Sequence, residues 1–506
     1  MFRYCGRFVA LVLASSLWAA PDARLLAQAP RPKPKSLEPA LIRLAIDPAA
    51  EPRPALKYSF VIPLAERKPG NAAPMYYRAI LAYSVFRVGT DAKQAADLDE
   101  RIDKWQSAPL ATFPRAEVHK AIDRFRAFED LRDGASREDC NWDWRLQDIE
   151  GPKSIEFLLE EVQRARGLTR WLAVKARLEI AEGRYGDAVD TLRVGYQFAR
   201  DIGKTPILIP GLVGIAITAV LDDQVHALIA APNSPNLYWA LTELPRPLID
   251  LRPALEFELT FPSRILPILK DPEHTLHSPE QWADLVSQAY YTLTHVLSDQ
   301  PREEPMGWQA RLAATGLALR GYTQAKRDLI AGGYDAGTVE RMPVGQVIAV
   351  DEAQLSRYIG DEMRKWAMVP YPEGWQRLKR ADARLVKEHY LGPGLSSREV
   401  IPINSLLLPA TSSALDASIR RDISIAADRV IEAIRMQAAQ NGGQLPQSLS
   451  EITVVTVPNH PRFGTPFPYK VEDGKATLEV RRSTEPPEPM QQQDEIFEIT
   501  IAGDRR

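Results

Sequence analysis

The sequence has little of the chemistry that most enzymes and metalloproteins need. Its 506 residues include two cysteines and seven histidines. It lacks a Gly-x-Ser-x-Gly nucleophile elbow, a phosphate-binding Gly-rich loop, a Cys-x-x-Cys pair and an EF-hand loop. Enzymes that assemble a site from distant residues leave no such signature. These absences therefore disfavour catalysis, a cofactor and a metal site without excluding them.

No charge of one sign dominates the chain. Its 63 basic and 66 acidic side chains leave a net charge of -3, so a dedicated surface for nucleic acid is not expected. Hydrophobic residues make up 45% of the sequence, which is enough to form buried cores. The length corresponds to about three domains.

The first 29 residues resemble a bacterial signal peptide. Arg3 and Arg7 precede an apolar run over residues 8–20, which is the order of a secretory leader. The small residues Ala27 and Ala29 offer two cleavage points. The run is shorter than the ~20 residues of a membrane-spanning helix, so we expect export with cleavage. An uncleaved N-terminal anchor is the alternative, and it would make the membrane a partner.

Cysteine usage predicts a fold without an internal disulfide. Cys5 lies in the leader, so the exported chain keeps Cys140 alone. Trp142 and Trp144 flank it, which favours a buried structural thiol. The alternative, a reactive thiol, would need a neighbouring base that the local sequence lacks.

Proline-rich stretches divide the rest of the chain. Residues 30–56 are predicted to be a linker and residues 57–264 a helical domain. Residues 265–390 form a second helical region, residues 391–411 another linker, and residues 412–506 a C-terminal α+β module.

Residues 171–203 are predicted to form a helical hairpin. Leu172, Ala176 and Ile180 fall on one face of a first helix, and residues 183–186 supply the turn. The phrase EGRYGDAVDTL, with the small Ala188, resembles a tetratricopeptide repeat. No second copy follows at the expected spacing, so we expect one such hairpin within an irregular helical body.

The uncharged run over residues 205–221 offers two interpretations. It could span a membrane, but it is short, contains Pro210, and continues into Asp222 and Asp223. A central buried helix is the preferred interpretation.

The C-terminal module is predicted to combine one long helix with about three antiparallel strands. An apolar stripe from Leu415 to Ile434 marks the helix, and residues 441–443 end it. Asp473-Gly474 marks a hairpin between two strands, and EIFEITI gives a third. The fold class is therefore mainly α, with irregular helical hairpins and this small module.

The same region resembles the head domain of type II secretion pseudopilins. The likeness rests on a Gly-x-x-Pro phrase after the helix and a Pro-x-x-Gly-x-Pro phrase before the sheet. The matching residues are Gly443, Leu445, Pro446, Pro461, Gly464, Pro466, Phe467 and Tyr469. The N-terminus departs from that family, because its apolar segment lacks an acid. As a whole, the chain also resembles large uncharacterised secreted bacterial proteins with a TPR-like helical body, which implies an architecture but no activity.

Two histidine clusters are candidate sites. His274 and His277 are spaced so that they could ligate zinc, but solvated loop positions are favoured. Asp222, Asp223 and His226 share one helical face and are the weak catalytic candidates. They could orient a proton donor or hold a metal, although a local ion pair at the end of the buried helix is favoured.

These features predict an exported binding or scaffolding protein of the bacterial envelope, without enzymatic activity and with a protein or peptide partner. One alternative is an envelope hydrolase with a site near Asp222 and His226. The other is an accessory component of a secretion or pilus-like assembly.

Overall fold

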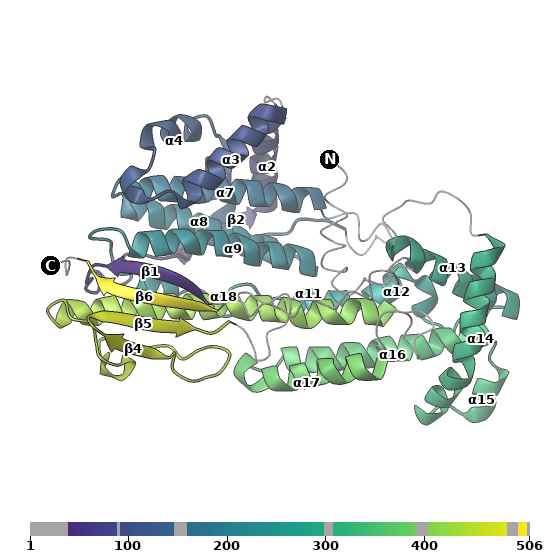
Figure 1. Cartoon of the computed structure of the whole chain (residues 1–506). Helices are drawn as coiled ribbons and strands as arrows, with labels where there is room; N and C mark the ends of the chain where they lie inside the picture. The colour runs from purple at the N-terminus through teal and green to yellow at the C-terminus, as the bar shows by residue number, and fades with distance from the viewer. Residues whose placement is uncertain are drawn as a thin grey trace, which may run out of the picture. The chain divides into compact units, whose positions relative to one another are not determined.

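The computed structural model describes residues 39–88, 92–145, 159–297, 307–389, 403–482 and 494–502. It confirms a mainly α fold with a small sheet (Figure 1). Two compact parts are distinguished: a larger part drawn from residues 32–142, 160–251 and 416–506, and a smaller part built around residues 252–415. The proposed signal peptide, residues 1–29, lies outside the described residues.

The larger part contains most of the helices. They are α2 (Ala73–Val88), α3 (Ala92–Ser107), α4 (Arg115–Ile122), α5 (Ala127–Ala135), α7 (Leu159–Ala181), α8 (Tyr185–Gly203), α9 (Leu208–Ile229), α10 (Tyr238–Thr242) and the C-terminal portion of α18 (Ile403–Gln440). Two short strands, β2 (Lys68–Asn71) and β3 (Arg137–Asp139), pair in parallel.

The predicted helical hairpin is present as α7 and α8. Gly183 adopts a φ of +72° between them, a left-handed conformation that glycine reaches without strain. α8 then packs closely on α9, and a Cβ added at Gly195 would lie 2.7 Å from Leu221. The small residue is what permits this approach.

Residues 208–221 of the uncharged run form the first part of α9, and most of this helix is buried. Among the described residues it is the one helix long and apolar enough to cross a membrane by length and composition. However, 61% of its most apolar window is buried within the fold. This burial fits the prediction of a central core helix, because packing against α8 already covers the apolar surface.

The sheet contains four strands, in the order β1-β6-β5-β4. Their bounds are β1 (Ala40–Ile46), β4 (Tyr469–Glu472), β5 (Lys475–Val480) and β6 (Glu495–Ile501). β4 and β5 form the predicted hairpin, and its turn residues Asp473 and Gly474 have φ values of 50° and 73°. Two consecutive positive φ values are what a type I′ hairpin turn requires.

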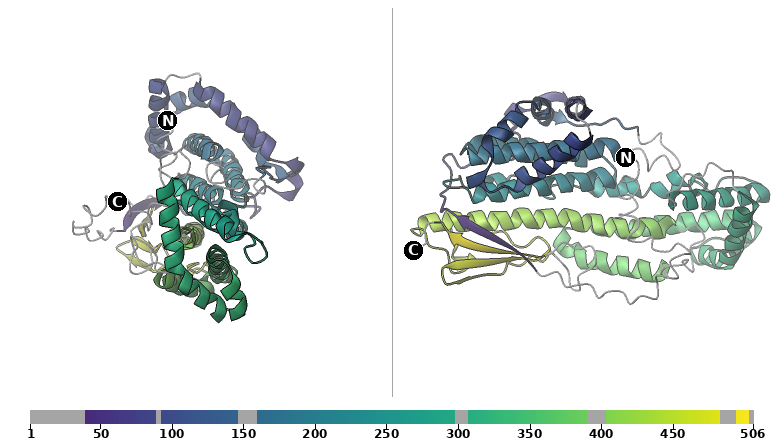
Figure 2. Two further views of the ribbon diagram at one scale, coloured as in Figure 1. Left: turned by 90° about the vertical axis from the view of Figure 1, so that its right-hand side faces the viewer. Right: turned by 45° about the horizontal axis from the view of Figure 1, so that its top comes forward.

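The prediction of a linker over residues 30–56 is wrong for residues 40–46, which form β1. This strand pairs in parallel with β6, and the two lie side by side in Figure 1 and in the right-hand view of Figure 2. Leu44 and Ile46 are buried while Arg43 and Ala45 are exposed. This alternation is that of a half-buried strand, and the surrounding prolines obscured it in the sequence.

The predicted linker over residues 391–411 is also shorter than expected, since residues 403–411 belong to α18. Residues 391–402 lie outside the described residues. α18 ends at Gln440, where Gly442 and Gly443 have φ values of 63° and 90°. Left-handed residues at this point terminate the helix, as predicted.

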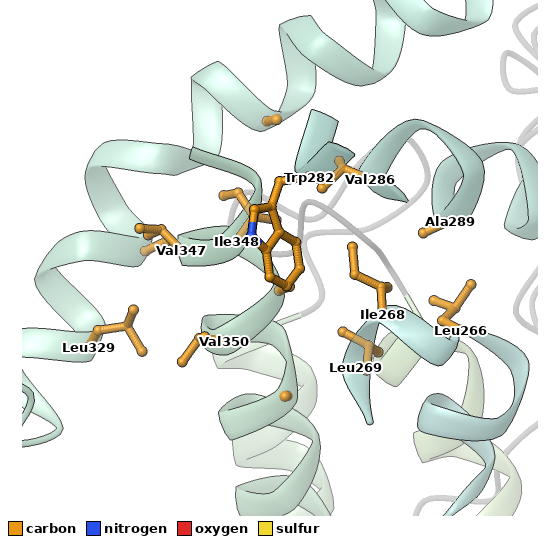
Figure 3. Close-up of a cluster of buried hydrophobic side chains, with 14 of the residues drawn as sticks. Leu266, Ile268, Leu269, Trp282, Val286, Ala289, Leu329, Val347, Ile348 and Val350 are labelled. Carbon is orange, nitrogen blue, oxygen red and sulfur yellow. The ribbon is translucent and has the colours of Figure 1, made fainter. Parts of the chain in front are cut away.

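The smaller part is helical. It comprises α11 (Arg252–Glu258), α12 (Phe261–Ile265), α13 (Pro279–Leu297), α14 (Trp308–Ala331), α15 (Ala336–Arg341), α16 (Val344–Ala367), α17 (Tyr371–His389) and the start of α18. Its core gathers around Trp282 of α13, with aliphatic side chains from α16 and from residues 266–269 (Figure 3). The interior of this part is predominantly apolar.

Candidate functional site

Asp222 lies in the interior of the larger part, on the C-terminal half of α9. Its Oδ1 accepts a hydrogen bond of 2.9 Å from the Tyr196 hydroxyl of α8. Its Oδ2 lies 2.5 Å from Nη1 of Arg421 on α18. The side chains of Asp222 and Arg421 are 6% and 8% exposed. Both carboxylate oxygens are therefore occupied, and the residue joins three helices.

His226 lies one turn further along α9 and also contacts α18. Its Nε2 is 2.8 Å from Oδ1 of Asp428, and its ring meets the edge of Phe497 of β6, with centroids 5.4 Å apart. The histidine side chain is 18% exposed and that of Asp428 is 1% exposed. The predicted local ion pair with Asp222 or Asp223 is thus replaced by a pair with a residue 202 positions away.

Electrostatics favour the charged form of His226. Burial alone would lower its pKa, but the carboxylate of Asp428 outweighs that effect through charge and a hydrogen bond. The pKa of His226 is consequently raised to about 9. An imidazolium held in this way is a poor general base at neutral pH.

Asp223, the third candidate, is exposed on α9 and lies outside these pairs. The charges of Asp222 and Asp223 still act on His226, but no hydrogen bond joins the three side chains among the interactions of the described residues. The structure uses Asp222 and His226 separately, in two contacts with α18.

Helix α18 carries further buried charged side chains. Glu432 and Arg435 form a fully buried pair, 2.8 Å apart. Arg435 also donates to the carbonyl oxygens of Asp47, Ser234 and Pro235. The Glu432–Arg435 pair lies within α18, whereas the three bonds to carbonyl oxygens join the helix to segments distant in sequence.

Nearer its middle, α18 repeats the pattern. Asp416 lies 2.5 Å from the buried Arg462, and Arg429 donates to the hydroxyls of Tyr238 and Thr242. The face of α18 that is polar in sequence is therefore buried as well as the apolar stripe. Its charged side chains make specific contacts with neighbouring segments of the larger part.

The histidines of the second cluster do not share a ligand position. His274 is exposed and lies 2.8 Å from Asp271, whereas the ring of His277 meets the edge of Trp282. No group of three or more His, Cys, Asp or Glu side chains is arranged for a metal ion within the described part of the chain.

Cys140 is partly buried beside the Asp201 cluster. Burial raises the pKa of its thiol, and the nearby carboxylate of Asp201 raises it further. Asp201 itself accepts from Tyr76, Gln197 and Lys204. A thiol held in its neutral form is a weak nucleophile, which fits the structural role expected from the sequence.

The residues that match the pseudopilin phrases have structural roles here. The Tyr469 hydroxyl donates to the carbonyl of Pro446 over 2.9 Å, joining the first phrase to the second. Leu445 and Phe467 are buried, and Gly464 adopts a φ of 69°. These residues shape the connection from α18 into the sheet.

Comparison of the chain with protein-family models, with curated proteins and with solved structures finds no significant match.

Proposed function

We propose that the chain is an exported, non-enzymatic binding or scaffolding protein of the bacterial cell envelope. Delivery is supported by the leader-like order of Arg3, Arg7 and the apolar run over residues 8–20. A binding role is supported by the helical architecture, because helices packed in hairpins present broad surfaces to peptides or proteins.

One observation carries the non-enzymatic part of this proposal: the strongest catalytic candidates are already engaged in the interior. A general acid or base must come within hydrogen-bond reach of its substrate. Asp222 is bound by Tyr196 and Arg421, and the Nε2 of His226 is bound by Asp428. Their contacts are those of residues that hold helices together.

The experiment is crosslinking in bacterial cells, with a C-terminal affinity tag, followed by purification from the envelope fraction and mass spectrometry. We expect an N-terminus near Gln28 or Pro30 and protein partners in constant ratio to the chain. A chain that stays cytoplasmic with its leader intact, or that captures nothing in constant ratio, contradicts the proposal.

Matched variants separate delivery from binding. Arg3→Glu with Arg7→Glu should abolish export, because a leader needs positive charge before its apolar run. Asp223→Asn, at the exposed candidate position, should leave both export and partner capture unchanged. Loss of a hydrolytic activity in Asp223→Asn, with folding intact, would instead support the hydrolase alternative.

A role as an accessory of a secretion or pilus-like assembly is a second candidate. It is favoured by the Tyr469–Pro446 hydrogen bond, which ties together the two pseudopilin-like phrases. This role predicts that secretion components are among the crosslinked partners. A chain that is monomeric in gently solubilised envelope extracts would argue against it.

A further inference from the structure

Helix α14 in the smaller part has an apolar row that stays exposed in the part of the chain that the structure describes. Trp308, Leu312 and Leu319 are 71%, 64% and 60% exposed. Their spacing of four and seven residues places them on one side of the helix. Single exposed apolar residues are common, but three large ones on one side of a helix indicate an interaction surface.

This row is distinct from the face that α14 uses for packing. Ala314, Ala318, Ala325 and Leu329 are buried, where α14 contacts α13 and α16. Figure 1 shows α14 beside α13 and α15 in this part. The helix is therefore held by one apolar face while the other remains exposed.

Positive charge lies next to the exposed row. α14 contains Arg311, Arg320, Lys326 and Arg327 against the single acid Asp328, so its net charge is 4 − 1 = +3. Arg311 pairs with Asp284, and Lys326 bonds to Glu340.

Arg320 and Arg327 are exposed and have no carboxylate within ion-pair distance in the part of the chain that the structure describes. Arg320 lies about 80° around the helix from Leu312, at 100° per residue. The two arginines therefore form a basic row on the outer side of α14, beside the apolar one.

We propose that α14 lies on an anionic phospholipid surface, with Trp308, Leu312 and Leu319 entering the interface and Arg320 and Arg327 meeting the lipid phosphates. Tryptophan prefers the boundary between headgroups and acyl chains. An amphipathic helix with apolar residues beside basic ones has the composition of an interfacial helix.

Charge selects lipid over a second copy of the chain as the occupant. Two α14 helices that paired through this row would bring the exposed Arg320 and Arg327 of one copy toward those of the other, and like charges repel. An anionic bilayer complements both rows at once. The contact deepens the proposed envelope role, on which it rests for its location, and does not require the leader to remain attached.

The test is flotation of the purified full chain with vesicles made of equal parts phosphatidylglycerol and phosphatidylcholine, compared with vesicles of phosphatidylcholine alone. We expect about tenfold stronger binding to the anionic vesicles, and loss of this preference at roughly 0.5 M NaCl. Hydrogen exchange with and without anionic vesicles should show protection localised to residues 308–330. Insertion of the leader cannot mimic that localised protection.

Two double variants and two controls separate the contributions. Trp308→Ser/Leu312→Ser should lower anionic vesicle binding about tenfold, and Arg320→Gln/Arg327→Gln should remove the lipid preference. Arg320→Lys/Arg327→Lys should retain it, since charge is conserved. Leu81→Ser changes an apolar residue of α2 that is 63% exposed, and it should alter neither quantity.

Equal binding to both lipids, or unchanged binding by the Trp308→Ser/Leu312→Ser variant with its helical circular dichroism intact, would overturn the proposal. Self-association of the chain without vesicles that this variant abolishes would also overturn it, and would assign the row to a second copy. Continued capture of envelope partners despite failed vesicle binding would leave the proposed function standing. Failure of both partner capture and vesicle binding would remove the proposed function as well.

Discussion

The two parts of the molecule differ in how much charge they bury. In the larger part, charged side chains lie inside, where α18 meets α9 and the segments around Asp47 and Ser234. In the smaller part the core gathers aliphatic side chains around Trp282, with Glu352 of α16 as a buried acid, and α14 displays basic and apolar rows outward. Both parts are helical, so secondary structure does not account for the difference.

The difference shows where each part gains specificity. Apolar packing depends on volume and tolerates several arrangements of similar shape. A buried ion pair requires its partner at one position, because an unpartnered charge in the interior is strongly unfavourable. We infer that the buried charges of α18 specify one placement of this helix within the larger part, whereas the smaller part depends on complementarity of shape.

The largest effect should come from breaking the buried Glu432–Arg435 pair. Arg435→Met should cost about 3–5 kcal/mol in the larger part, because it leaves the carboxylate of Glu432 buried without its partner. Protection of α18 amides against hydrogen exchange measures this loss locally.

Two controls test whether burial causes that cost. Lys475→Met breaks a pair with Glu498 at 3.6 Å in which the lysine is exposed, and it should cost under about 1 kcal/mol. The double variant Arg435→Met/Glu432→Leu should recover much of the stability, since both charges are removed. If the double variant is no more stable than Arg435→Met, the hydrogen bonds of Arg435 to backbone carbonyls account for most of the lost stability.

The His226–Asp428 pair should make the larger part sensitive to alkaline pH. The pKa of His226 rises from an ordinary value of 6.5 to about 9 on folding. The contribution is therefore complete below pH 6.5 and is lost as pH rises through 9. The shift corresponds to about 3 kcal/mol.

This dependence can be measured by hydrogen exchange of the α18 amides in increasing urea at each pH. The rates are corrected for the pH dependence of intrinsic exchange. His226→Gln should flatten the difference between pH 6 and about pH 9.5. Protection of α16 in the smaller part should change far less over the same range. An equal response in both parts would assign the pH effect to general titration instead.

Local signals account for the elements that the sequence could predict. The α7–α8 hairpin, the burial of α9 and the turn at Asp473-Gly474 each depend on residues within one or two turns of each other. Periodicity, glycine position and the absence of charge report such short-range structure directly.

Pairing between distant segments accounts for what could not be predicted. β1 joins β6 at the far end of the chain, and His226 meets Asp428 across 202 positions. Asp222 and His226 could be selected from the sequence, but Tyr196, Arg421 and Asp428 could not. In an amphipathic helix pattern, a buried arginine or aspartate looks the same as a solvated one.

Tight helix packing in the smaller part can be tested at Gly345 of α16. A Cβ at this position would lie 2.8 Å from the backbone oxygen of Trp282, so α13 and α16 would have to separate. Gly345→Ala should cost about 1–3 kcal/mol, measured as reduced protection of α16 amides. Unchanged protection would mean that this interface adapts more readily than the contact distance indicates.

The smallest effect should come from the matched glycine on the outer side of α14, and its sign should be opposite. A Cβ at Gly316 meets no atom within 4 Å, and this residue lies in the helix interior. Gly316→Ala should therefore stabilise α14 by about 0.5–1 kcal/mol, because alanine loses less backbone entropy in a helix. Slower exchange of α14 amides measures the gain, and vesicle binding should persist because the apolar and basic rows are unchanged. A destabilised α14 would show that this outer side is already packed against part of the chain, which would also remove the surface that the lipid contact requires.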